Sequence, residues 1–143
     1  VQPTHATSDM YWAEERLGKK RIHTAYVYND LLKQNNRIAF GTDFPVENIS
    51  PVYTFYAAVA RKDLSNYPEK GFQLGNKVSR ENTLRAMTTW AAYTCFEEKE
   101  KGMLAPGMFA DFVILSDDIM TLPEKEIPSV KVEATYLDGE KVF

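Results

Sequence analysis

Cysteine is nearly absent from this sequence, and so are the residue patterns that build a complete metal or phosphate site. The single cysteine, Cys95, cannot form an intrachain disulfide, and we expect it to be a buried structural thiol. Two histidines and one cysteine are too few for a full zinc site. No H-x-H, H-E-x-x-H or C-x-x-C pair occurs, and no glycine-rich phosphate loop.

Long hydrophobic runs and excess positive charge are also missing. No apolar stretch approaches the roughly 18 residues that span a bilayer, so we expect no membrane partner. A formal net charge of −3 gives no electrostatic reason to expect nucleic acid as a partner. The first residues do not read as a signal peptide, and the cytoplasm is the expected compartment. The start without Met leads us to expect a chain cut from a longer one.

What is present predicts α/β structure over residues 1–101 and β-rich structure over 102–143. We expect a short extended piece and a polar loop over 1–9, helices over 10–18, 22–34, 51–62 and 80–95, and strands over 37–41, 109–115 and 131–143. The apolar run in 37–41 is typical of a parallel strand buried on both faces, so residues 1–41 predict a right-handed βαβ unit.

Local signals refine these elements. Asp9 and Ser79 are good N-caps for the helices that follow them. Leu84, Met87, Ala91 and Cys95 recur at helical spacing and predict the core-facing stripe of the helix over 80–95. The dipeptide 138–139, Asp-Gly, predicts a tight hairpin inside the last β segment.

Asp43 is the strongest candidate for chemistry. It comes just after the predicted strand 37–41, and barrel enzymes place catalytic groups at the carboxyl ends of parallel strands. A carboxylate there could bind a divalent metal and accept a proton from a water that the metal activates. The alternative is that Asp43 caps a turn or the next helix, since Asp is common in such places.

His5 is the second candidate. It follows the predicted N-terminal extended segment and could contact a substrate or act as an acid or base. The alternative is a histidine that only makes structural hydrogen bonds. His23, after three basic residues, is expected on the surface, and Glu47 is expected to be solvated.

Three stretches together resemble one family. Residues 1–5 (VQPTH) with 12–18 (WAEERLG) resemble the loop after the seventh barrel strand of the amidohydrolase family 3 group, which includes YtcJ-like and N-substituted formamide deformylase-like proteins. Residues 39–46 (AFGTDFPV) resemble its eighth-strand motif, with Thr42 where Ser is usual. Residues 101–115 (KGMLAPGMFADFVIL) are similar to the segment that opens the C-terminal β-sandwich strands.

The resemblance implies the C-terminal part of a metal-dependent (β/α)₈ TIM barrel over 1–101 and strands of a small β-sandwich over 102–143. It implies a parent that hydrolyses carbon–nitrogen bonds of small amides or formamides, with a divalent metal, zinc being the expected one. Asp43 matches the eighth-strand aspartate, a metal ligand and proton acceptor. His5 matches a loop histidine near the substrate.

The remaining ligands of such a parent are not in this sequence, because a barrel takes about 250 residues. We therefore expect the chain alone to be inactive and metal-free. We also expect it to self-associate, since strands meant for a closed sheet would present open edges. A non-catalytic α/β interaction module and a catalytically dead amidohydrolase relative are the alternatives.

Overall fold

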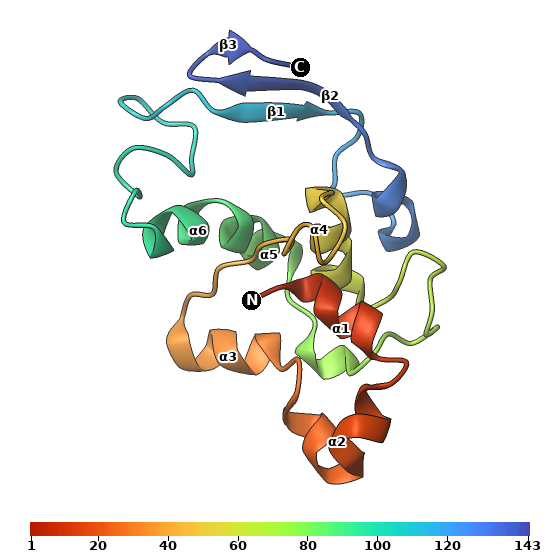
Figure 1. Cartoon of the computed structure of the whole chain (residues 1–143). Coiled ribbons are helices and arrows are strands. Elements are labelled where there is room, and N and C mark those ends of the chain that lie inside the picture. The colour runs from red at the N-terminus through yellow and green to blue at the C-terminus, as the bar shows by residue number, and fades with distance from the viewer.

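The computed structural model describes all 143 residues, with a helical part that leads into a small sheet near the C-terminus (Figure 1). All three strands follow residue 101, where β-rich structure is predicted, whereas residues 1–101 form helices and no strand. The elements are α1 (Pro3–Asp9), α2 (Ala13–Arg21), η1 (Ile22–Thr24), α3 (Tyr28–Asn35), α4 (Pro51–Ala60), η2 (Leu74–Asn76), α5 (Arg80–Met87), α6 (Thr89–Thr94), β1 (Phe112–Leu115), η3 (Glu124–Ser129), β2 (Val132–Leu137) and β3 (Glu140–Lys141).

Helix α4 lies at the centre of the helical part and confirms the helix predicted over 51–62. Every residue from Thr54 to Ala60 is buried, so this helix is apolar nearly all round. It packs against α1 and α5, and also against η3, which leads into β2. Phe55 and Ile127 belong to one buried cluster and join the helical part to the β-rich part.

The sheet has the order β1-β2-β3, with antiparallel pairing throughout. Asp138 and Gly139 connect β2 to β3 with φ values of +49° and +81°. Positive φ at both central residues is the requirement of the favoured hairpin turn, so the predicted hairpin is confirmed. Phe112 and Tyr136 stack across β1 and β2 with ring centroids 4.5 Å apart.

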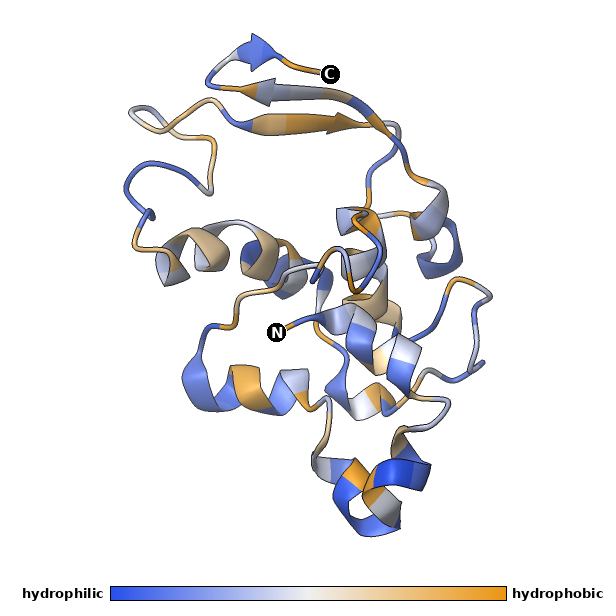
Figure 2. Cartoon of the chain, in the orientation of Figure 1, coloured by the Kyte–Doolittle hydropathy of each residue, from blue (hydrophilic) through white to orange (hydrophobic).

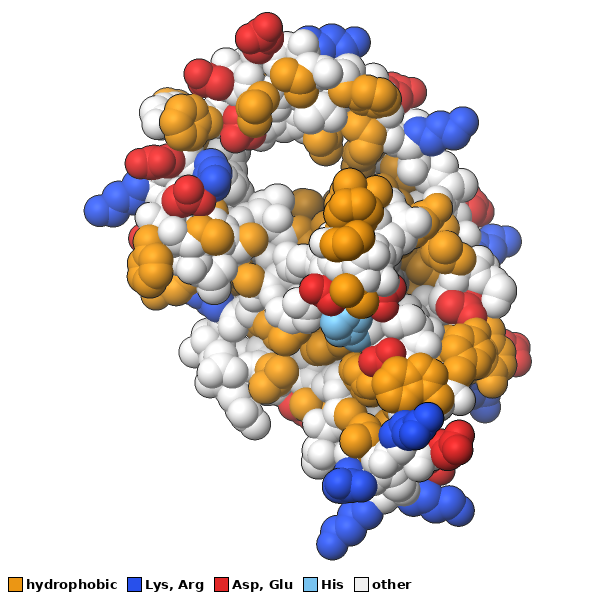
Figure 3. Space-filling model, in the orientation of Figure 1, with side chains coloured by type: hydrophobic (Ala, Val, Ile, Leu, Met, Phe, Trp, Pro, Cys, Tyr) orange, Lys and Arg blue, Asp and Glu red, His pale blue; other side chains and the backbone are white.

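Strand β1 is hydrophobic yet poorly covered (Figure 2). Val113 and Ile114 are adjacent, so they point to opposite faces of the sheet, and both are exposed. Figure 3 shows an opening through the molecule between the sheet and the helices, with hydrophobic side chains around it. The sheet therefore presents apolar surface on both faces, and β1 is also an edge strand.

The predicted strand over 37–41 is wrong as a regular strand, because these residues belong to no sheet. One rung of parallel pairing is nevertheless present. The amino group of Val1 donates to the carbonyl of Ala39 at 2.8 Å, and Gly41 N–H donates to the carbonyl of Val1 at 3.1 Å. This one bridge, between Val1 and Phe40, does not form a parallel ladder, because no second strand lies alongside to continue the pairing. This bridge is the only strand pairing present of the predicted βαβ unit.

The extended start predicted over 1–9 is also wrong, since α1 occupies most of it. Pro3 takes the first helical position, where its missing N–H is no loss. Helix α2 begins at Ala13 with no side-chain cap. The predicted cap Asp9 instead accepts a hydrogen bond from the Tyr26 hydroxyl.

The helix predicted over 22–34 is divided into η1 and α3. Tyr26 has a φ of +57°, in the left-handed region, which ends helical structure between the two pieces. His23, in η1, is exposed as predicted.

The helix predicted over 80–95 begins as expected, with Ser79 Oγ accepting from the N–H of Asn82 at 3.2 Å. It then breaks at Thr88 into α5 and α6. Gly102 packs into this break, where an added Cβ would come within 3.1 Å of the Thr88 carbonyl oxygen and the Thr89 Cα. A turn later in the chain thus packs closely against the break.

The break also changes which side of the helix faces the core. Thr83 and Ala86 are buried, whereas Leu84 and Cys95 are exposed. The predicted core-facing stripe is therefore wrong at Leu84 and Cys95, whereas Met87 does pack against the buried clusters. Cys95, predicted to be buried, is an exposed thiol just after α6.

No helix of the chain combines the length and the hydrophobicity that crossing a bilayer requires.

Candidate active site

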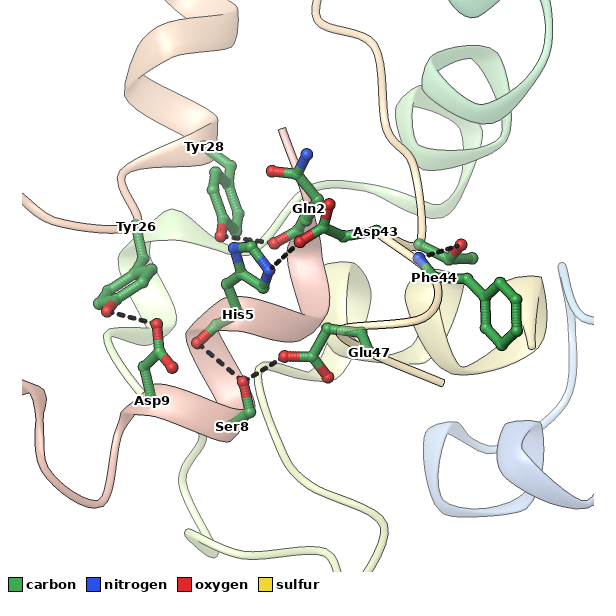
Figure 4. Close-up of polar contacts among 10 residues, drawn as sticks. Gln2, His5, Ser8, Asp9, Tyr26, Tyr28, Asp43, Phe44 and Glu47 are labelled. Atoms are coloured by element: carbon green, nitrogen blue, oxygen red, sulfur yellow. Dashed lines mark hydrogen bonds and ion pairs between the residues drawn. The ribbon is translucent and has the colours of Figure 1, made fainter. Parts of the chain in front are cut away.

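Helix α1 places His5 beside the loop that carries Asp43. Thr4, Ala6 and Thr7 are buried, and α1 packs against α4. His5, which lies between Thr4 and Ala6 in the sequence, is half-buried. The buried residues therefore hold the helix in place, and the His5 imidazole stays within reach of the neighbouring loop (Figure 4).

Asp43 lies three residues beyond Phe40, the centre of the parallel rung, and stands at a turn. Its φ is +62°, a left-handed conformation that Asp tolerates better than most residues. Its carbonyl accepts the N–H groups of Val46 and Glu47 at 2.9 and 3.3 Å. The carboxylate accepts no backbone N–H, and the residue before α4 is Ser50. Asp43 therefore opens a turn through its carbonyl, as the alternative expects, but its side chain caps neither that turn nor α4.

The two predicted site residues touch each other. His5 Nε2 lies 3.1 Å from Asp43 Oδ2, although 38 positions separate the residues in the chain (Figure 4). The carboxylate can only accept, so Nε2 carries the hydrogen and donates it. The two side chains are 31% and 38% exposed, which makes the pair reachable by a small molecule. Their catalytic roles remain predictions.

A second hydrogen bond reinforces the pair. Ser8 Oγ donates to Glu47 Oε1 at 2.6 Å, again joining α1 to the loop after Asp43 (Figure 4). Glu47 is half-buried rather than fully solvated, so that prediction is wrong in part. Sequence reasoning missed this contact. The sequence spacing is the signal that could have revealed this contact, because Ser8 lies one helical turn after His5 and Glu47 lies four residues after Asp43.

Two tyrosine hydroxyls connect the region near α3 to the start of the chain by hydrogen bonds. Tyr28 donates its hydroxyl to the carbonyl of Gln2 at 2.9 Å, and Tyr26 donates to Asp9 at 2.8 Å. Burial raises the pKa of Tyr28 to about 12, against the opposing effect of the nearby Arg61 guanidinium. Burial and the bond to Asp9 raise the pKa of Tyr26. Both hydroxyls therefore keep their hydrogen at neutral pH and hold α1 in place.

The candidate site offers a metal ion part of a ligand set. Asp43 supplies carboxylate oxygens, of which one pairs with His5, and carboxylate and imidazole are both ligands of divalent zinc. No group of three or more His, Cys, Asp or Glu side chains is arranged around a common point. Carboxylate and imidazole groups suit a divalent metal, but His5 and Asp43 are too few ligands to complete its coordination sphere.

Comparisons with known proteins identify the family of this chain. The model of the amidohydrolase family matches residues 1–143. Two curated relatives align over the whole chain, "Putative amidohydrolase YtcJ" from Bacillus subtilis (strain 168) at 27% identity and "Protein LONG AFTER FAR-RED 3" from Arabidopsis thaliana at 33%. The chain spans about a quarter of their lengths, 27% and 24% respectively.

A solved structure shows the same relationship in space. An uncharacterized metal-dependent hydrolase from Pyrococcus horikoshii OT3 is 29% identical, with a TM-score of 0.72. The similarity covers 87% of this chain and 25% of that one. The α/β arrangement is thus that of one portion of metal-dependent hydrolases. With a family model that covers every residue, this chain belongs to the amidohydrolase family.

Proposed function

We propose that the chain is the C-terminal part of a longer metal-dependent hydrolase that cleaves carbon–nitrogen bonds other than peptide bonds in small molecules. Residues 1–101 complete its (β/α)₈ barrel, and residues 102–143 supply strands of a small β-sandwich. The observation that carries the proposal is the contact of His5 with Asp43, just beyond the parallel rung between Val1 and Phe40. Barrel enzymes collect their catalytic groups at this end of parallel strands.

Asp43 is the residue of this chain that binds the metal and accepts a proton. Its turn fixes the carboxylate beside His5, and one of the two carboxylate oxygens makes no hydrogen bond in the chain. The metal, zinc being the expected one, acts as a Lewis acid and makes water a better nucleophile at neutral pH. His5 holds the carboxylate by its Nε2–H and stands where it can also contact a substrate.

Metal removal tests this proposal in the longer protein. We expect chelation to lower the hydrolysis of N-formyl and N-acyl compounds by about 10³-fold or more, since the Lewis acid is lost, and added Zn²⁺ to restore it. Initial rates before and after dialysis measure the effect. Rates that survive complete metal removal would contradict a metal-dependent hydrolase. A metal-loaded protein that hydrolyses none of these compounds would favour the alternative of a catalytically dead amidohydrolase relative.

We further propose that the isolated 143-residue chain self-associates through its sheet. Strand β1 has a free edge, and Val113 and Ile114 expose apolar side chains on its two faces. Edge strands of this kind pair with other copies unless a charge blocks them.

We expect the isolated chain to be oligomeric in light scattering at tens of micromolar, and the substitution Ile114→Lys to shift it toward monomer. A lysine at an edge strand opposes strand pairing because its charge would have to be buried. Leu64→Lys is the matched control, because Leu64 is also exposed but lies in the loop after α4. A wild-type chain that is monomeric throughout would show that the sheet does not self-associate.

A further inference from the structure

The loop over residues 42–49 carries Asp43 but has no hydrophobic anchor. None of its residues is buried. Its large apolar side chains, Phe44, Val46 and Ile49, are all exposed. Burial of apolar surface therefore does not hold this loop against the helices, and its position depends on polar contacts.

Two hydrogen bonds connect this loop to another element, and both end on α1. His5 Nε2 donates to Asp43 Oδ2 at 3.1 Å, and Ser8 Oγ donates to Glu47 Oε1 at 2.6 Å (Figure 4). The other hydrogen bonds of the loop are local. A hydroxyl that donates to a carboxylate makes a shorter and stronger bond than one between neutral groups, which agrees with the 2.6 Å from Ser8 to Glu47. The loop is thus attached to α1 at two points, one helical turn apart.

Glu47 is also connected to Asp43 through the backbone. The N–H groups of Val46 and Glu47 donate to the Asp43 carbonyl and close the turn. Asp43 has a φ of +62°, a left-handed conformation that costs free energy for a residue with a Cβ. Such a conformation persists only where the surrounding contacts hold it. Glu47 supplies two of these contacts, because its N–H closes the turn and its carboxylate attaches the turn to α1.

We propose that Glu47 is a positioning residue of the candidate site. Through Ser8 it holds the Asp43 turn against α1, so that the Asp43 carboxylate stays beside His5. The Glu47 carboxylate accepts from Ser8 and does not join His5 and Asp43 in a group that could surround a metal ion. The effect of Glu47 on hydrolysis rests on the proposed function, whereas its effect on the contact of His5 with Asp43 does not.

Exchange of the His5 ring hydrogen with water measures this contact without any catalysis. The chain has two histidines, and His23 is exposed, so His23 is an internal reference in the 143-residue chain labelled with ¹⁵N-histidine. With both rings neutral, we expect the Nε2 hydrogen of His5 to exchange more slowly than the ring hydrogen of His23, because Asp43 accepts it. Glu47→Ala should raise the exchange rate at His5 about fivefold or more in NMR, since the loop then opens more often.

Four further variants separate positioning from a general loss of structure. Glu47→Gln should keep the rate within about twofold of wild type, because the amide oxygen can still accept the Ser8 hydroxyl. Ser8→Ala should match Glu47→Ala, and the double variant should be no worse than either single one, because the two residues make one interaction. If Glu47→Ala does not fold, Ser8→Ala decides, since alanine is favoured in a helix. Glu69→Ala is the control, because Glu69 is exposed in the loop after α4.

In the longer protein, Glu47→Ala should lower kcat about tenfold and leave KM within about twofold, because the Asp43 carboxylate is misplaced while the substrate contacts remain. Glu47→Gln should restore kcat. Exchange at His5 that is unchanged in both alanine variants, a glutamine variant as impaired as Glu47→Ala, or a rise in KM alone would overturn the positioning role. The expected exchange rates in a chain whose longer form hydrolyses no amide would uphold that role and contradict the proposed function.

Discussion

Replacing Asp43 by asparagine in the longer protein should lower kcat/KM for hydrolysis by about 10³-fold or more, because a general base alone contributes about 10²–10⁴-fold. Asparagine keeps the size of the side chain and can still bond to His5. It carries no negative charge for a metal and cannot accept a proton at neutral pH. Steady-state kinetics of wild type and variant, at equal metal content, measure the loss.

Two comparisons separate chemistry from folding. Asp117→Asn changes an exposed aspartate near β1 and should leave kcat/KM within about twofold, since surface substitutions rarely matter. His5→Gln keeps a hydrogen-bond donor but loses the imidazole, and its loss should be smaller, about 10–100-fold as for residues that orient a ligand. If Asp43→Asn retains near wild-type kcat/KM, Asp43 is neither the metal ligand nor the proton acceptor.

Asp43 could be singled out from the sequence because its selection depends on a short-range rule. Asp43 follows an apolar run that resembles a buried strand, and the carboxyl ends of such strands meet at one edge. His5 was a separate candidate, which the family resemblance places near the substrate, and its contact with Asp43 was not predicted. The second contact, from Ser8 to Glu47, was missed because neither residue belongs to a distinctive motif, although each follows a candidate site residue by three or four positions.

The elements that were wrong depend on partners distant in the chain. Residues 38–40 have the composition of a strand covered on both faces, but only Val1 lies alongside to pair with them. The break at Thr88 lies where Gly102, from a later turn, packs against the helix, and that contact cannot be read from residues 80–95. The helix at Pro3 is the exception, since proline at a first helical position is a local signal that sequence reasoning could have used.

Truncating Phe55 to alanine should be the most destabilising single change in the core of this chain. Phe55 is 1% exposed and packs in the cluster of α4 with η3, where Ile127 is fully buried. Removing a buried phenylalanine ring costs about 3–5 kcal/mol, because contacts are lost and a cavity remains. Small domains are stable by about 5–15 kcal/mol, so the loss is a large share of the free energy of unfolding.

Thermal and urea unfolding followed by circular dichroism measure this loss. Phe96→Ala is the matched control, because Phe96 is 92% exposed and its truncation should change the stability by no more than about 0.5 kcal/mol. Since Phe55 joins the helical and β-rich parts, Phe55→Ala should also separate their unfolding, so that helical signal persists after the sheet has melted. Equal stability of the two variants would mean that α4 does not hold the β-rich part, and that the connection through η3 is not what stabilises the chain.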